Sequence, residues 1–144
     1  MKALKLHLTG EITPCELNEE NFEYKFQAMQ KAIDCDCIDI VHAAKLPDPY
    51  CLVVDDEALL KDKPVINLYA SYLYGFLEHG QPICGEVIIM KDKHTPDGID
   101  TIGLEPEDFA QIMDLIVNPE TVKGIKETLD GVMKLVEGNE NETV

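Results

Sequence analysis

Val87-Ile88-Ile89-Met90 is an uninterrupted apolar run, entered through Ile83-Cys84-Gly85 and followed at once by Lys91 and Asp92. A strand with one solvent-exposed face alternates apolar and polar residues, and this run does not alternate. It is instead typical of a strand that is buried on both faces of its sheet. The run therefore predicts a core strand, around which the other elements of the chain must pack.

Further strands are predicted on the N-terminal side of this run. Residues 3–8 alternate apolar residues with Lys and His, Thr9-Gly10 is typical of a turn, and residues 11–17 form a return strand. The chain is thus expected to open with a β-hairpin. Residues 37–42 and 50–54 are two more strand-like segments, and the prolines between them require a loop.

A first helix is predicted over residues 19–33. Asn18 is a good N-cap, because its side chain can accept a hydrogen bond from a free N–H of the first turn. Leu17 precedes the cap with the spacing of a hydrophobic staple. Apolar residues then recur at steps of four, three and four, which predicts one buried stripe. Its members are Phe22, Phe26, Met29 and Ile33.

A second helix is predicted to begin at Pro106. Proline is well suited to the first helical position, and Glu107 and Asp108 place negative charge at the positive end of the helix dipole. The expected buried face is Phe109, Ile112, Met113 and Ile116.

A last helix is predicted to begin at Asn118-Pro119 and to end near residue 137. Its apolar residues recur at heptad-like steps of three and four. They are Val122, Ile125, Leu129, Val132 and Val136. Gly124 and Gly131 are placed about opposite this stripe, where each costs ~1 kcal/mol of helix stability relative to Ala. Packing of the stripe, on the core or on a second copy of the chain, is therefore expected to hold this helix.

Two segments are less regular. Residues 65–76 fit either a helical stripe or irregular structure, and the charged stretch 91–98, with its Pro and Gly, is expected to be a loop. Taken together, the elements predict an α+β fold. We expect a small mixed or antiparallel sheet packed by one long helix, with two C-terminal helices. A chain of 144 residues is large enough for one such domain without disulfides.

The charge of the chain excludes several classes of function. The sequence has no arginine, and 12 lysines face 28 acidic residues, for a net charge of −16. Such a field repels DNA, RNA and anionic lipid surfaces, and Arg contacts to phosphate or guanine are impossible. No apolar stretch is long enough to span a membrane, and no export signal is recognised, so we expect a cytoplasmic protein with reduced cysteines.

The order of elements and several short motifs are similar to those of a known family. The motifs include Lys2-Ala3-Leu4, Leu52-Val53-Val54-Asp55-Asp56-Glu57, and the apolar strand with its Ile83-Cys84-Gly85 entry. The last is Leu104-Glu105-Pro106-Glu107-Asp108-Phe109. Through them the chain resembles a family of short uncharacterised bacterial and phage domains on mobile elements of Gram-positive bacteria.

This resemblance covers roughly residues 2–117 and sets the expected organisation. Residues 1–117 would form the family's α+β domain, 118–137 an appended helix, and 138–144 a flexible tail. The chain departs from the family pattern by having Cys84 before Gly85 and by having Asn67 without the usual Arg. An anion-binding role for that Arg therefore does not carry over to this chain.

Aromatic residues with hydroxyl tips provide the main candidate binding site. Such residues suit both ligand pockets and interface hot spots, because a flat apolar ring carries a polar group at its edge. The chain has no Trp, so these tyrosines form a large share of its aromatic surface. The candidate binding residues are Tyr50, Asn67, Tyr69, Tyr72 and Tyr74. Packing of the same residues in the core is the structural alternative.

Cysteine and histidine residues provide a weaker candidate. Cys35-Asp36-Cys37, with His42 and Cys51 downstream, is the nearest approach to a metal site, but the C-x-C spacing has no second paired motif. Asp55-Asp56-Glu57 lacks the spacing of a calcium-binding loop. No elbow motif, P-loop or dinucleotide fingerprint accompanies the four histidines or the five cysteines. We therefore expect no metal, no cofactor and no catalytic residue.

The sequence thus favours a non-catalytic acidic binding protein of a phage or plasmid. One version sequesters or inhibits a host factor, as in counter-defence. The expected partner is a protein, basic in that version, or a small molecule. The alternative is a small metal- or small-molecule-dependent enzyme that uses Cys35, Cys37 and His42. A third interpretation is a homodimer formed through the C-terminal helix.

Overall fold

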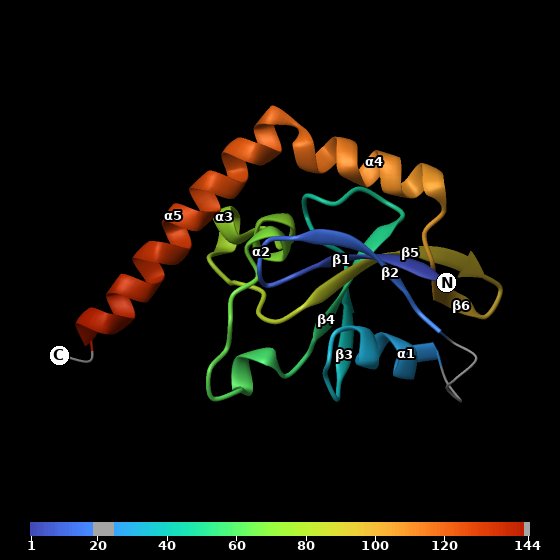
Figure 1. Ribbon diagram of the computed structural model, residues 1–144, viewed down its shortest axis with the longest axis horizontal. Coiled ribbons are helices and arrows are strands. Elements are labelled where there is room, and N and C mark those ends of the chain that lie inside the picture. The colour runs from blue at the N-terminus through green and yellow to red at the C-terminus, as the bar shows by residue number, and fades with distance from the viewer. Residues whose placement is uncertain (19–24, 143–144) are drawn as a thin grey trace.

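The computed structural model describes residues 1–18 and 25–142 and contains a six-stranded sheet (Figure 1). The strands are β1 Lys2–Leu6, β2 Ile12–Glu16, β3 Ile38–Val41, β4 Tyr50–Asp55, β5 Val87–Thr95 and β6 Gly98–Ile102. Their order is β2-β1-β5-β4-β3, with β6 also paired to β5. Every pairing is antiparallel. The predicted α+β class is confirmed, with an antiparallel rather than a mixed sheet.

The apolar run Val87–Met90 lies at the centre of the sheet, as predicted. Its side chains alternate between two cores: Val87 and Ile89 face one, and Ile88 and Met90 face the other. All four are fully buried. β1 pairs with the first half of β5 through the register Leu4↔Ile89, and β4 pairs along its other edge.

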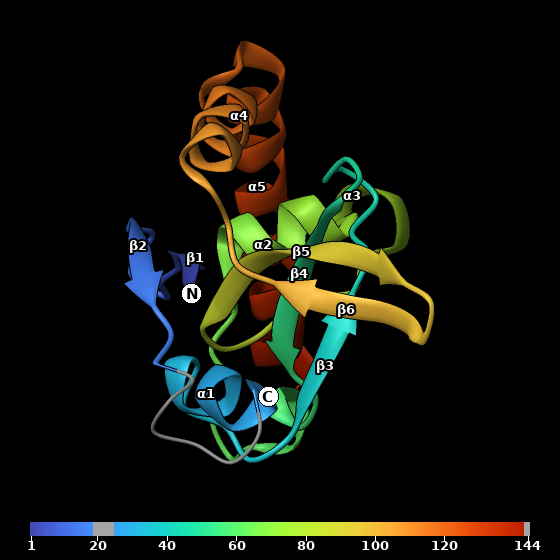
Figure 2. The same cartoon turned by 90° about the vertical axis from the view of Figure 1, so that its right-hand side faces the viewer.

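Helices cover both faces of the sheet. α1 Lys25–Ala32 lies on the face of Ile88 and buries Ala28 and Met29, whereas α2 Leu68–Tyr74 and α4 Pro106–Val117 lie on the opposite face (Figures 1 and 2). The predicted helix packs on one face of the sheet, and α2 and α4 cover the other face in addition. Both faces need a cover because β5 is buried on both sides.

The predicted stripe of the first helix is only partly correct. Met29 and Ile33 are buried, but Phe26 is 46% exposed, and Ala28 is buried instead. Phe22 and the rest of residues 19–24, which include the first turn of the predicted helix, lie outside the described residues. The predicted N-cap role of Asn18 acts on that turn and is outside them as well.

The charged stretch 91–98 is a hairpin rather than a loop. β5 continues to Thr95 and pairs with β6 through Lys93↔Asp100 and His94↔Ile99. The apolar signal of β5 ends at Met90 because the strand runs beyond the core, so both faces become polar. Opposite charges across the ladder and the Lys25–Asp100 ion pair at 3.1 Å compensate for the missing apolar contacts.

The irregular segment 65–76 is helical. α2 spans Leu68–Tyr74 and α3 spans Phe76–His79, after a short 3-10 turn, η2, at Ala58–Leu60. Asn67 is the N-cap of α2, and its Oδ1 accepts a 3.2 Å hydrogen bond from Ala70 N.

α4 begins as predicted, at Pro106, with a capping box formed by Glu105 and Asp108. Asp108 Oδ2 accepts a 2.7 Å hydrogen bond from Glu105 N. Ile112 and Ile116 are buried, but the expected inward position of Met113 is wrong, because that side chain is exposed. α4 presents a narrower apolar face to the sheet than the sequence suggests.

α5 spans Pro119–Glu142 and runs beyond the predicted end at residue 137. Its inward face is made of small residues rather than the heptad-like stripe. They are Thr121, Gly124, Thr128 and Gly131. Packing of Val122, Leu129 and Val136 on the core of their own chain is wrong, because these side chains are exposed. The glycines lie on the packed face, one residue before members of the stripe.

Two aromatic rings explain this reversal. A Cβ atom at Gly124 would collide with the ring of Tyr72, and one at Gly131 would lie 2.7 Å from Phe76 Cε1. The helix backbone can approach α2 and α3 this closely only where no side chain intervenes. No helix within the described ranges is both long enough and apolar enough to cross a membrane.

Candidate functional site

Asn67 is buried and acts as a structural bridge. It is 1% exposed. Its Nδ2 donates to Leu6 O at 2.9 Å and to Gly85 O at 3.0 Å, while its Oδ1 caps α2. The side chain thus satisfies backbone groups of three separate segments. No part of it is exposed enough to form a recognition surface.

Tyr50 and Tyr72 are also buried. Tyr50 Oη donates to Asp108 Oδ1 at 2.9 Å and also contacts Gln111 Oε1 at 2.8 Å. Burial, followed by the hydrogen bond to Asp108, raises the pKa of Tyr50 to about 12. The Tyr72 ring lies between α5 at Gly124 and the Lys45 ammonium, which is 5.7 Å from the ring centroid. Tyr50 thus joins α4 to β4, and Tyr72 joins α5 to α2.

Tyr69 and Tyr74 are the half-buried members of the set. Tyr69 packs against the edge of the core, and Tyr74 makes an edge-to-face contact with His79 at a centroid distance of 4.9 Å. The five candidate residues therefore do not come together as one surface. A binding role for Tyr69 and Tyr74 stays a prediction, and the other three have structural contacts that explain them.

The cysteine and histidine candidates lie at opposite ends of β3. Cys37 precedes the strand and His42 follows it, so the intervening residues separate them by ~16 Å at the rise of an extended chain. Cys35 Sγ donates to Cys37 O at 3.5 Å, whereas His42 Nε2 bonds Asp92 Oδ2 at 2.5 Å. Within the part of the chain that the structure describes, no three His, Cys, Asp or Glu residues are arranged to hold a metal ion.

The thiols are poor nucleophiles. Burial is the largest cause that raises the pKa of Cys35, to about 11, and that of Cys51, to about 12; neighbouring carboxylates add to both shifts. The thiolate is the reactive form, and it is scarce at neutral pH when the pKa is this high. Cys35 and Cys37 are thus not brought together with His42, and the alternative of a metal- or small-molecule-dependent enzyme stays a prediction.

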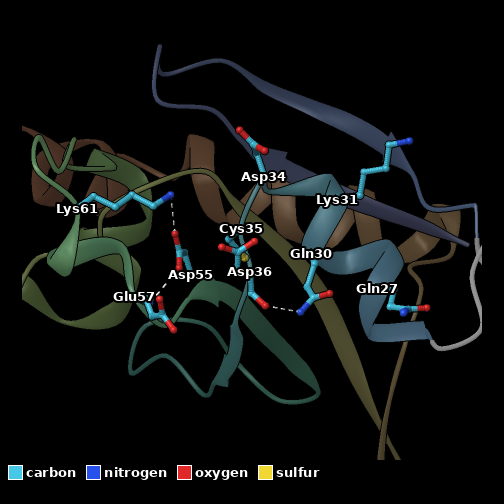
Figure 3. A pocket seen from close by; sticks show the side chains of 9 residues that line it. All are labelled: Gln27, Gln30, Lys31, Asp34, Cys35, Asp36, Asp55, Glu57 and Lys61. Atoms are coloured by element: carbon cyan, nitrogen blue, oxygen red, sulfur yellow. Dashed lines mark hydrogen bonds and ion pairs between the residues drawn. The ribbon is translucent and has the colours of Figure 1, made fainter.

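A polar cavity of about 520 Å³ lies between α1 and the far end of β4 (Figure 3). Asp55 is its buried carboxylate. Its Oδ2 pairs with Lys61 at 3.0 Å, and its Oδ1 accepts a hydrogen bond from Glu57 N at 2.9 Å. Gln30 Nε2 donates to Asp36 O at 2.5 Å across the mouth. The Asp55 carboxylate is thus already satisfied by its neighbours and offers no free oxygen to a ligand.

The exposed stripe of α5 is the stronger candidate. Leu129 is 45% exposed and Met133 is 51% exposed, and Val122 and Val136 are also open to solvent. On a helix with 3.6 residues per turn, these four positions fall within ~60° of arc and span ~21 Å. We call this set, with the half-buried Ile125 and Val132 at its edge, the α5 stripe. The C-terminal half of α5 projects beyond α3 (Figure 1).

The α5 stripe lies in the most acidic third of the sequence. Residues 105–144 contain 10 acidic residues and 3 lysines, a net charge of −7. The stripe therefore combines apolar contact area with a negative surrounding field. Its periodicity was visible in the sequence, but its exposure was not, because heptad-like spacing is equally typical of a buried face.

Residues 1–117 match the family model described as Domain of unknown function (DUF3846). The match ends where α4 ends, so α5 lies outside it. No curated protein and no solved structure matches the chain. The predicted resemblance to an uncharacterised domain family is confirmed over the range that the motifs indicated.

Proposed function

The chain belongs to the DUF3846 family, and on the geometry of its appended helix we propose that it is a non-catalytic binding protein whose α5 stripe captures a basic amphipathic helix of a partner protein. The observation that carries the proposal is the exposure of Val122, Leu129, Met133 and Val136 on one side of α5. Exposed apolar side chains clustered in this way are typical of interaction sites.

The shape of the stripe supports a helical partner. It is ~21 Å long, or about four turns, and its apolar residues recur at the spacing with which two helices interlock. Helix-in-groove recognition uses the same spacing of anchors on the incoming peptide. The inward Gly face holds α5 close to α2 and α3, so the stripe is presented on a supported helix.

The charge supports a basic partner rather than a second copy. The net charge is −16, so two copies repel each other on approach, whereas a basic segment is attracted and its association is accelerated. The proposal includes a host protein as the partner and a phage or plasmid as the origin of the chain. Capture would then block the host protein by occupying its basic surface.

The direct test uses a synthetic 18-residue amphipathic helix of Leu and Lys as the probe, with a Leu/Glu peptide of the same pattern as its counterpart. We expect saturable binding of the basic peptide alone, measured by isothermal titration calorimetry. The Leu129→Asp/Met133→Asp variant should weaken binding about tenfold or more, because each half-exposed side chain contributes about 1 kcal/mol on burial. The added negative charges attract the basic peptide at long range, so a loss must come from the removed apolar contacts and from desolvation of the new carboxylates.

Leu59→Asp/Leu60→Asp is the matched control. These leucines are also exposed, but they lie on η2, away from α5. Equal loss in the two variants would contradict the proposal. Light scattering provides the other decisive outcome: we expect a monomer, and a dimer that Leu129→Asp dissolves would instead assign the stripe to a second copy.

A further inference from the structure

In the part of the chain that the structure describes, the sheet has three free edges, which are β2, β3 and β6. Each of these strands has a strand neighbour on one side only. A free edge presents unpaired backbone N–H and C=O groups, and a strand of another molecule can add to them. The register of each ladder determines which backbone groups point outwards.

The outward edge of β2 lacks a donor at its centre. Residue pairs of an antiparallel ladder alternate between pairs that exchange both backbone hydrogen bonds and pairs whose N–H and C=O groups point away from each other. His7 N donates to Glu11 O at 2.9 Å, in register with the β1–β2 ladder, so the odd-numbered residues of β2 are bonded to β1. The even-numbered residues therefore point outwards. The middle one is Pro14, which has no N–H.

On β3 an outward donor is present but already used. Asp56 N donates to Cys37 O at 3.0 Å, one pair beyond the start of the β3–β4 ladder. By the same alternation, the backbone groups of Ile38 and Ile40 point outwards. Ile40 N donates to Oδ1 of its neighbour Asp39 at 2.9 Å. The exposed Asp39 side chain thus caps one of the two outward N–H groups of β3.

The same short-range cap occurs on β6. Asp92 N donates to Pro49 O at 2.8 Å, so the even-numbered residues of β5 face β4 and the odd-numbered ones face β6. It follows that Thr101 points its backbone groups away from β5. Thr101 N donates to Asp100 Oδ1 at 2.9 Å, and Thr101 O accepts a 2.8 Å hydrogen bond from the Lys25 ammonium.

We propose that Pro14, Asp39 and Asp100 close the sheet to strand addition, and that Asp39 matters most. β3 is the most apolar of the three edges, with two isoleucines and one valine in four residues, and Ile40 is 37% exposed. The strand that it would otherwise accept is β3 of a second copy, because an antiparallel pair of identical edges is self-complementary. This inference does not rest on the α5 stripe.

The charge of the chain does not replace these caps. A net charge of −16 keeps copies apart at long range, but salt screens it. The caps act at contact, where an added strand would have to displace a carboxylate from each N–H or meet a proline ring.

Amide hydrogen exchange, measured by NMR on the ¹⁵N-labelled full chain, tests the caps directly. Relative to its intrinsic rate, Ile40 should exchange at least about fivefold more slowly than Ile38, although both amides point outwards. Thr101 should differ from Ile99 in the same way. Asp39→Ala should remove the protection of Ile40 and leave that of Thr101. Equal exchange of the capped and uncapped amides overturns the proposal.

Sedimentation in 1 M NaCl, where the Debye length is about 3 Å, tests the consequence. We expect Asp39→Ala to raise the self-association constant at least about tenfold over that of the unmodified chain. Asp39→Asn keeps the Oδ1 acceptor without the charge and should behave like the unmodified chain. Asp56→Ala is the matched control, because it removes an exposed carboxylate near the same end of β3 and should have no effect.

Pro14→Val provides a second variant, because it restores the outward N–H at the centre of β2 and should also promote association. If neither Pro14→Val nor Asp39→Ala associates, the proposal is wrong. Association of Asp39→Asn as strong as that of Asp39→Ala would assign the block to charge and also contradict it. Equal association of every variant and the unmodified chain would contradict it as well. If Leu129→Asp/Met133→Asp abolished that association, the contact would belong to the α5 stripe.

Discussion

Tyr50 Oη donates a 2.9 Å hydrogen bond to Asp108 Oδ1 and so ties the first residue of β4 to the first turn of α4. The other oxygen of the same carboxylate accepts from Lys91 Nζ at 2.7 Å and from Glu105 N at 2.7 Å. One partly buried carboxylate therefore joins two strands to the start of the helix that leads into α5. Removing the Asp108 carboxylate should therefore weaken the contacts among β4, β5 and α4.

Asp108→Asn should lower the free energy of unfolding by about 2–3 kcal/mol, because the Lys91 charge loses its partner and the cap is weakened. Tyr50→Phe removes only one hydrogen bond and should cost about 1 kcal/mol. Urea unfolding measures both. Asp97→Asn, in the exposed turn, is the control and should change stability by less than about 0.5 kcal/mol.

Asp108 should also make stability depend on pH. Burial acts to raise its pKa, but hydrogen bonds from Lys91, Glu105 N and Tyr50 outweigh that effect, so the pKa is lowered from 3.8. A lowered folded-state pKa means that the unfolded chain binds the proton first. The contribution is full above the unfolded value and is lost as pH falls through the folded value. Asp108→Asn should therefore flatten the acid limb of the stability profile below about pH 4.

Gly124→Ala and Gly131→Ala should each destabilise the protein by about 1–3 kcal/mol, as overpacking does. In a free helix the same changes would stabilise by ~1 kcal/mol. The sign reverses because the new methyl groups would meet Tyr72 and Phe76. Gly138→Ala is the matched control, since nothing lies within 4 Å of its added Cβ, and it should be neutral or stabilising. Thermal unfolding distinguishes the two signs.

Asn67→Asp should cost about 3 kcal/mol although it preserves shape and the helix cap. The substitution replaces two donated hydrogen bonds with a carboxylate that faces the carbonyls of Leu6 and Gly85. Asn118→Asp tests the same exchange where no donor is used, because the Asn118 side chain accepts from Glu120 N. We expect no loss there. Similar unfolding midpoints for the two variants would show that Asn67 is not a bridge.

The order in which the cysteines are alkylated should reveal how accessible and how reactive each thiol is in the folded protein. At pH 8 iodoacetamide should modify exposed Cys37 first, though slowly, because a hydrogen bond with Glu57 raises its pKa. Cys51 and Cys84 are buried and should react only after unfolding. Mass spectrometry with and without urea measures the order. Rapid reaction of Cys35 in the folded protein would restore the thiol-enzyme alternative.

The sequence predicted the elements whose signals are local. The apolar run 87–90 and the Pro106 helix start are both found where their residues indicate, because burial and capping chemistry act over a few neighbouring positions. The 91–102 hairpin was missed because its strands extend past the core and carry charges on both faces. Local patterns identify a strand chiefly through the apolar residues that it buries.

Whether the predicted tyrosine set can bind a partner depends on which side of each helix or strand faces inwards. The sequence did not determine this. Asn67 and Tyr72 were predicted as binding residues from their chemistry, but the partners that bury them are distant in the chain, at Gly85 and Gly124. α5 shows the same difficulty. Its heptad-like spacing is typical of a buried face, but in the structure the glycine face packs against two aromatic rings. Such long-range pairings leave no periodic signal.

The contacts of Gly124 with Tyr72 and of Gly131 with Phe76 cross the end of the family match. The rings belong to the matched residues 1–117, and the glycines that receive them belong to α5. The two rings and the two glycines fit only together. We therefore expect the four positions to be inherited together. Relatives that lack the helix should replace both rings with smaller or polar residues, and relatives that keep the rings should carry a helix with small residues seven positions apart. Positions 72 and 76 of the matched segment should therefore indicate whether a relative carries a helix equivalent to α5.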